Sequence, residues 1–327
     1  MLEKGDPMKG EVLMLDDRKL IKKDVNTFTG GLLLYLLIGF IGFIIYIFGY
    51  LAKGAIIDGK TIDAMMTTIN TDATKTGIPY LINICFGLPI LFLLCKGVVR
   101  RKLTVVNKAM SRSDFFMLLC CFMSVQLINI LISTGAEKLF NQFGYTLSKA
   151  IESASSASAT ISMFLYASVF GPIVEEIIFR GLVMRGLERY GKQFAIIVSS
   201  IIFGAYHGNL VQGFFAFLVG VVLGYVAMEY SLKWAIALHL INNCLFNDLM
   251  SYAVSGLNDM TQTILFMSIE GFFGLCTVVI FVIKRKEIAA YFRENKAFGL
   301  KHALTSLGMI FFLFIMFLIS LTGIGKL

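Results

Sequence analysis

The sequence predicts an all-α, polytopic bundle of transmembrane helices, with eight to nine spans and a cytoplasmic N-terminus. Hydrophobic residues make up 57% of the 327 residues and charged residues only 15%, whereas soluble domains carry roughly a quarter charged residues. The mean hydropathy is +0.79. The apolar stretches are too long for barrel strands, and lipid offers no hydrogen-bond partner to an open strand edge, so helical spans are expected.

Nine apolar stretches of helix length follow one another along the chain. They lie at 29–52, 79–99, 114–134, 159–184, 194–209, 212–230, 233–250, 262–283 and 303–322. The chain then divides into four parts, which are a cytoplasmic N-terminal lead at 1–28, spans at 29–134, a core at 159–250 and C-terminal spans at 262–327. Eight spans result if the first or the last stretch does not cross the bilayer.

The charge pattern predicts the orientation of these spans. The formal net charge is +8, and the 29 Lys and Arg residues gather in alternate segments between the apolar stretches. Such a bias places the basic segments in the cytoplasm, so the N-terminus is expected inside and the C-terminus outside. The basic excess is therefore interpreted as a topology signal and a contact with anionic lipid, and nucleic acid is not an expected partner.

Two adjacent carboxylates stand out in the core. Glu175 and Glu176 lie inside the apolar run from Ala159 to Met184, which reads ATISMFLYASVFGPIVEEIIFRGLVM. A charge near the centre of a bilayer costs about 2.5 to 3.5 kcal/mol on insertion scales, so two together indicate a function. Histidines follow at positions 207 and 239, in the fifth and seventh apolar stretches.

Helix geometry gives the two glutamates different roles. Glu176 and Arg180 are four residues apart, which places them on one helix face in the favourable order for an ion pair. Glu175 is rotated by about 100° from Glu176 and lacks that partner. We therefore expect Glu175 to act as the base and the Glu176–Arg180 pair to support it.

Two further pairs share one helix face each, because Phe203 precedes His207 and His239 precedes Asn243 by four residues. In one interpretation Glu175 and His207 polarise a water molecule, while His239 and Asn243 donate hydrogen bonds to the developing oxyanion. In the alternative, His207, His239 and Glu175 bind zinc, whose open position holds the water. The chain has no HExxH run, which weakens the zinc interpretation.

Structural roles are the competing explanation for each of these residues taken singly. A membrane histidine is often a helix–helix hydrogen-bond partner, and a Glu–Arg pair is often structural. The conjunction favours a reaction centre, because two of only three histidines lie in the stretches that follow the Glu pair, within the same core. Four amide side chains of the apolar stretches are expected to join helices, namely Gln126, Asn129, Asn242 and Asn247. Glu270 is expected to serve helix packing or to stand at the entrance of the site.

At these residues the sequence resembles the CAAX-protease and bacteriocin-processing (Abi) family of intramembrane proteases. The family motifs Glu-Glu-x-x-x-Arg, Phe-x-x-x-His and His-x-x-x-Asn stand here as EEIIFR, FGAYH and HLINN. All three are intact and in order, on three separate predicted helices. The resemblance covers about residues 159–250, whereas the flanking spans match only in being apolar.

The resemblance implies an endopeptidase that cleaves membrane-associated protein or peptide substrates, including lipidated proteins and peptide signals. By this resemblance, Glu175 and His207 are expected to activate water, and His239 and Asn243 are expected to form the oxyanion hole. Family members are labelled metalloproteases, although a metal-free glutamate mechanism is also proposed. The resemblance further implies a multi-pass protein of a bacterial plasma membrane. A non-proteolytic scaffold for an envelope enzyme or sensor kinase, and a proton-coupled transporter, are the competing functions.

Overall fold

The computed structural model describes residues 7–61, 63–66, 69, 75–95 and 103–327, with side chains from Asp16 onward. Residues 1–6 of the predicted lead, residues 96–99 of the second predicted span and parts of two predicted loops lie outside the described residues. The described chain is almost entirely helical. Two short strands, β1 (Tyr145–Thr146) and β2 (Gly325–Lys326), pair in antiparallel fashion and join the end of the chain to the segment after α4.

The longer helices correspond to the nine predicted stretches, and each stretch lies largely within helix where it is described. The helical elements are α1 (Pro7–Ile56), α3 (Ile78–Leu94), α4 (Arg112–Gln142), α5 (Ser148–Ser155), α6 (Ile161–Phe164), η2 (Leu165–Phe170), α7 (Gly171–Glu176), η3 (Ile177–Met184), α8 (Arg185–Leu187), η4 (Glu188–Tyr190), α9 (Lys192–Tyr206), α10 (Leu210–Glu229), α11 (Leu232–Leu240), η5 (Ile241–Leu249), α12 (Met250–Val254), α13 (Asp259–Glu294), α14 (Leu300–Leu304), α15 (Leu307–Ser320) and η6 (Leu321–Gly323).

The predicted all-α, membrane-like class is confirmed. Among the described residues, five helices are long and apolar enough to cross a membrane, by length and composition. They are Asp16–Ile56, Arg112–Gln142, Ile161–Tyr190, Leu210–Glu229 and Asp259–Glu294. Shorter apolar helices lie at Ile78–Leu94, Lys192–Tyr206 and Leu307–Gly323. The number of spans and the side of the N-terminus remain predictions.

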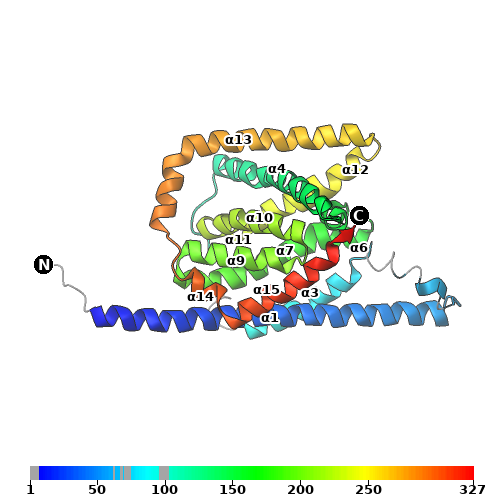
Figure 1. The fold of residues 1–327 in the computed structure, drawn as a ribbon, viewed down its shortest axis with the longest axis horizontal. Helices are drawn as coiled ribbons and strands as arrows, with labels where there is room; N and C mark the ends of the chain where they lie inside the picture. Colours follow the sequence, from blue (N-terminus) through cyan, green and yellow to red (C-terminus); the bar gives the residue numbers. More distant parts are fainter. Residues whose placement is uncertain (1–6, 62, 67–68, 70–74, 96–102) are drawn as a thin grey trace.

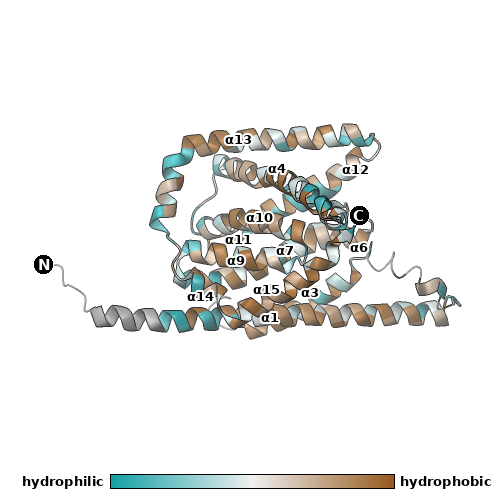
Figure 2. Cartoon of the chain, viewed as in Figure 1, coloured by the Kyte–Doolittle hydropathy of each residue, from teal (hydrophilic) through white to brown (hydrophobic). Residues whose placement is uncertain are grey.

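Figure 1 shows α1 along one edge of the molecule and α13 along the opposite edge, with α7, α9, α10 and α11 between them. Helix α1 has 50 residues, which at 1.5 Å per residue gives a length of about 75 Å, well above the thickness of a bilayer. The hydrophilic parts of α1 and α13 lie at the same end of the molecule (Figure 2). This is the end that the charge pattern predicts to be cytoplasmic.

The predicted lead is continuous with the first span in the structure. Helix α1 runs without a break from Pro7 through the described part of the lead into the span. Ile21, Val25 and Phe28 are buried, and the packing of α1 involves α14 and α15. A Cβ at Gly186 would lie only 2.2 Å from the ring of Phe28, so the lead also packs closely on α8. The N-terminal segment is therefore part of the bundle from Ile21 onward.

Helix α9, which leads into the motif from Phe203 to His207, packs closely on α10. A Cβ at Gly204 would lie 2.6 Å from the carbonyl oxygen of Gly213, and one at Gly224 would lie 3.0 Å from Ile196. Small residues let two backbones approach closely in the absence of a hydrophobic force between helices. The Asn209 side chain caps α10 by accepting hydrogen bonds from the backbone of Val211 and Gln212. Only three residues therefore separate α9 from α10, and His207 is among them.

Candidate active site

The three motifs lie on neighbouring elements at the centre of the bundle. Glu175 and Glu176 end α7, Arg180 follows in η3, and His207 directly follows α9. Helix α7 packs on α11, and η3 packs on α9. The ring of Phe203 lies 4.9 Å from the ring of His207 and 6.2 Å from that of His239, centroid to centroid. The two histidines, which are 32 positions apart in sequence, therefore flank the same phenylalanine.

Glu176 is the hub of a buried hydrogen-bond network. Its Oε1 accepts from Arg180 Nη1 at 2.8 Å and from His239 Nδ1 at 2.9 Å. The Glu176 side chain is 0% exposed and that of Arg180 only 1%. The Arg180 guanidinium also lies over the ring of Phe203, with Cζ 4.2 Å from the centroid. A Cβ at Gly220 would lie 3.3 Å from Arg180 Nη2, so a glycine there leaves room for the guanidinium.

These hydrogen bonds define the tautomers of both histidines in their neutral states. An ionised Glu176 can only accept, so the proton of His239 is on Nδ1. The backbone carbonyl of Phe203 also only accepts, and it lies 2.8 Å from His207 Nδ1. Each neutral imidazole therefore has its lone pair on Nε2. For His239, Nε2 lies 3.8 Å from Glu175 Oε2.

Glu175 faces a small cavity rather than the ion pair. The cavity has a volume of about 10 Å³ and is lined by Glu175, Tyr35 of α1, Tyr166 of η2 and Tyr206 of α9, among others. That volume matches the space of a single water molecule. The Glu175 side chain is 19% exposed, in contrast to the buried Glu176. The two adjacent carboxylates therefore occupy different environments. Glu176 is buried and held by hydrogen bonds, whereas Glu175 is partly accessible.

Wide π-helical turns adjoin the motif residues. The segments η2 and η3 flank α7, and η5 directly follows α11. Such turns are uncommon in proteins and occur frequently at functional sites. Each π-helical turn changes the helix face on which the following residues lie. Asn243 lies within η5 and therefore in an irregular part of its helix.

The amide of Asn243 is already engaged on both atoms. Its Nδ2 donates to the carbonyl of Ala167 at 3.0 Å, and its Oδ1 accepts from Asn242 Nδ2 at 2.8 Å. Asn242 in turn accepts from Gln126 Nε2 at 2.8 Å. The expectation that Gln126 and Asn242 join helices is thus confirmed, since this bond links α4 to η5. One N–H of Asn243 remains for a ligand.

Sequence reasoning missed a buried carboxylate in η5, Asp248, which is 0% exposed. Its oxygens accept from the backbone N–H and the hydroxyl of Ser158, each at 2.7 Å, and from the hydroxyl of Ser168. Ser168 also donates to the backbone carbonyl of Asn243 at 3.3 Å. Asp248 therefore joins the segment before α6 and the segment η2 to the element that carries Asn243. An Asp inside the stretch 233–250 was the available sequence signal.

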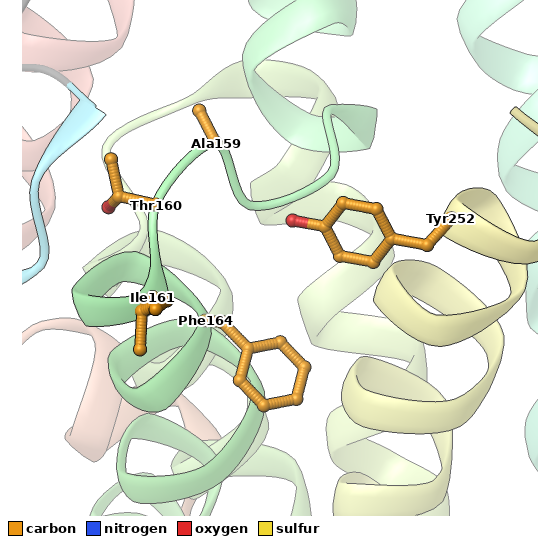
Figure 3. Close-up of a pocket in the computed structure, with 5 residues that line it drawn as sticks. All are labelled: Ala159, Thr160, Ile161, Phe164 and Tyr252. Carbon is orange, nitrogen blue, oxygen red and sulfur yellow. The ribbon is translucent and has the colours of Figure 1, made fainter.

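A second cavity lies away from the motif residues. It has a volume of about 300 Å³ and is lined by Ala159, Thr160, Ile161, Phe164 and Tyr252. Figure 3 shows the Tyr252 hydroxyl directed toward the segment that contains Ala159, and this hydroxyl donates to the carbonyl of Ser158. Among the described residues, its lining holds no charged side chain.

The predicted zinc set does not assemble as a metal site. Within the described part of the chain, no three His, Cys, Asp or Glu side chains are arranged to hold a metal ion. Glu175, His207 and His239 do not form such a group in this arrangement, and we derive no step through a metal.

A comparison with known protein families found a match over the motif helices. Residues 157–245 match the family model described as type II CAAX prenyl endopeptidase Rce1-like. This match places the motif segment in the CAAX protease family. The matched segment holds all three motifs and spans about a quarter of the chain, so α1, α3, α13 and α15 lie outside it. No curated protein and no solved structure matches the chain. The family assignment supports a membrane protease of the CAAX endopeptidase type, with a membrane-associated substrate.

Proposed function

We propose that this CAAX protease family member is an intramembrane endopeptidase of a bacterial plasma membrane. Its substrate is a membrane-associated protein or peptide, such as a lipidated protein or a peptide signal. One observation carries the proposal: Glu175 faces a cavity with the volume of one water molecule, while Glu176 beside it is held by Arg180 and His239. Glu175 is free to accept a proton, whereas Glu176 is held by its hydrogen bonds, and this arrangement fits the hydrolysis of a peptide bond.

In this mechanism Glu175 is the general base. A water molecule in the cavity transfers a proton to Glu175 while its oxygen bonds to the carbonyl carbon of the substrate peptide. The lone pair on His207 Nε2 accepts the second O–H of the water and orients it. When the tetrahedral intermediate collapses, the C–N bond breaks and Glu175 returns its proton to the leaving nitrogen.

Glu176 and Arg180 position the other histidine in this proposal. The hydrogen bond from His239 Nδ1 to Glu176 fixes the ring, so that Nε2 faces Glu175 at 3.8 Å. Arg180 neutralises Glu176 in a region with no exposure to solvent. Phe203 supports both groups, because its ring lies beneath the guanidinium and beside the two imidazoles.

A non-proteolytic scaffold is the competing function, and substitution separates the two. The full-length protein is reconstituted in liposomes with candidate lipidated and peptide-signal substrates, and the products are identified by mass spectrometry. We expect cleavage by the wild type and none by Glu175→Gln or His207→Ala. Glu270→Gln is the matched control, since it removes another carboxylate of an apolar helix outside the cavity.

Cleavage that persists in Glu175→Gln would refute the assigned base. Absence of cleavage in the wild type across the substrate panel, together with a cellular phenotype that survives both substitutions, would favour the scaffold. Solute uptake that depends on a proton gradient would favour the transporter.

A further inference from the structure

The N-terminal lead and the segment before α15 carry a group of basic side chains at one end of the molecule. We call this group the basic cluster, and it consists of Arg18 and Lys22 of α1 with Lys301 and His302 of α14. Helix α1 packs on α14, and Figure 2 shows hydrophilic residues on both helices where they meet. A Cβ at Gly299, the N-cap of α14, would lie 2.8 Å from the side chain of Ile21. The two helices therefore approach each other closely.

Helix geometry places Arg18 and Lys22 on the side of α1 that faces α15. Arg18, Lys22 and Asn26 follow one another at intervals of four residues, so they share one helix face. The side-chain oxygen of Asn26 accepts from the backbone N–H of Gly308 at 2.7 Å. This hydrogen bond holds that face of α1 against the start of α15, which follows α14 in the chain.

The cations of the cluster are not neutralised by one another's neighbours. Burial lowers the pKa of the His302 imidazole, and the positive charges of Arg18, Lys22 and Lys301 lower it further. These three cations form no ion pair with any residue whose side chain the structure describes. Like charges that are gathered without a counter-charge favour the binding of an anion.

The acidic side chains of the lead lie on other faces of α1. Asp17 and Asp24 are seven residues apart and share one face, and the Asp24 carboxylate accepts hydrogen bonds from two side chains of η4. Asp16 is two residues from Arg18, which places it about 200° around the helix. The acidic residues are therefore turned away from the cluster.

Exposed apolar side chains begin close to the basic cluster. Leu307 is 80% exposed and Phe311, on the same face of α15, is 57% exposed. On α1, Phe40 lies five turns beyond Lys22 on the same face and is 61% exposed. A cationic surface that continues into an apolar one matches an anionic lipid, which has a charged phosphate group and apolar chains. A soluble anion would match the cationic part alone.

We propose that the basic cluster binds the phosphate headgroup of an anionic glycerophospholipid, whose acyl chains lie along the exposed apolar faces of α15 and α1. Arginine and lysine side chains donate charge-assisted hydrogen bonds to phosphate oxygens. The bound phosphate contacts α1 and α14 together, so the lipid joins the N-terminal lead to the C-terminal helices. This site is separate from the cavity of Glu175 and does not depend on peptide-bond hydrolysis there.

The test measures the binding of phosphatidylglycerol to the full-length protein in micelles of a zwitterionic detergent, by native mass spectrometry. The first variant combines Arg18→Gln with Lys22→Gln, and the second is Lys301→Gln on the other helix. The matched control combines Lys19→Gln with Lys23→Gln, which removes two exposed charges, four residues apart, from a face of α1 rotated by about 100°. Inorganic phosphate is added as a competitor.

We expect the Arg18→Gln and Lys22→Gln double variant to bind phosphatidylglycerol about 30-fold more weakly than the wild type, which is about fivefold for each charge removed. Lys301→Gln should weaken binding about fivefold, whereas the control double variant should bind as the wild type does. An equal loss in the two double variants would indicate a diffuse attraction and overturn the inference. Displacement of the lipid by millimolar inorganic phosphate would indicate a site for a soluble anion and would also overturn it.

Discussion

The buried Glu176–Arg180 pair gives the sharpest prediction of stability. Arg180→Met removes the cation and leaves Glu176 with the hydrogen bond from His239. Because the side chains are 0% and 1% exposed, solvent cannot replace the lost charge. Breaking a buried pair from one side costs about 3 to 5 kcal/mol. We therefore expect the free energy of unfolding to fall by that amount.

Equilibrium unfolding in mixed micelles measures this loss in a double-mutant cycle with Glu176→Gln. The double variant should cost less than the sum of the single variants, because it leaves no uncompensated charge. Arg189→Met is the control, since its partner is Asp24 and its side chain is 52% exposed, so a loss of at most about 1 kcal/mol is expected. A loss below about 1 kcal/mol in Arg180→Met, with additive effects in the double variant, would refute the reasoning.

Three further predictions concern packing, positioning and metal. Gly204→Ala should destabilise the protein by about 1 to 3 kcal/mol, because the added Cβ would lie 2.6 Å from the Gly213 carbonyl oxygen. Gly135→Ala is the control, since its Cβ would meet nothing within 4 Å, and it should be neutral or stabilising in the same unfolding assay. Asp248→Ala should leave the two donors of Ser158 without an acceptor, at a cost of about 1 to 3 kcal/mol each. An unchanged unfolding midpoint would argue against a role of Asp248 in joining these segments. Cleavage should survive a strong zinc chelator, and loss of cleavage that added zinc restores would contradict the metal-free mechanism.

The sequence predicts the helices well because lipid allows few alternatives. Each long apolar stretch has to satisfy its own backbone groups, so hydropathy alone locates α4, α10 and α13. The pairing of Glu176 with Arg180 also follows from local geometry, since residues four apart meet on one helix face. Predictions of this kind need no knowledge of how the helices pack.

The other features of the site depend on contacts between residues far apart in the chain, and the sequence does not show these contacts. No periodicity indicates that Tyr35 of α1 reaches the cavity of Glu175, because that contact depends on how α1 packs on α3 and α3 packs on η2. The tautomers of His207 and His239 likewise depend on partners that only the fold provides. Asp248 was visible as a charge in an apolar stretch, but its role became clear only from the serines around it.

Hydrolysis in water enriched in heavy oxygen tests the central claim most directly. Glu175 is proposed to activate a water molecule from its cavity, so the new C-terminal carboxylate of the product should gain one heavy oxygen atom. The same product should be absent with Glu175→Gln and present with Glu270→Gln. A labelled product formed equally well by Glu175→Gln, or a cleaved product without label, would contradict the account.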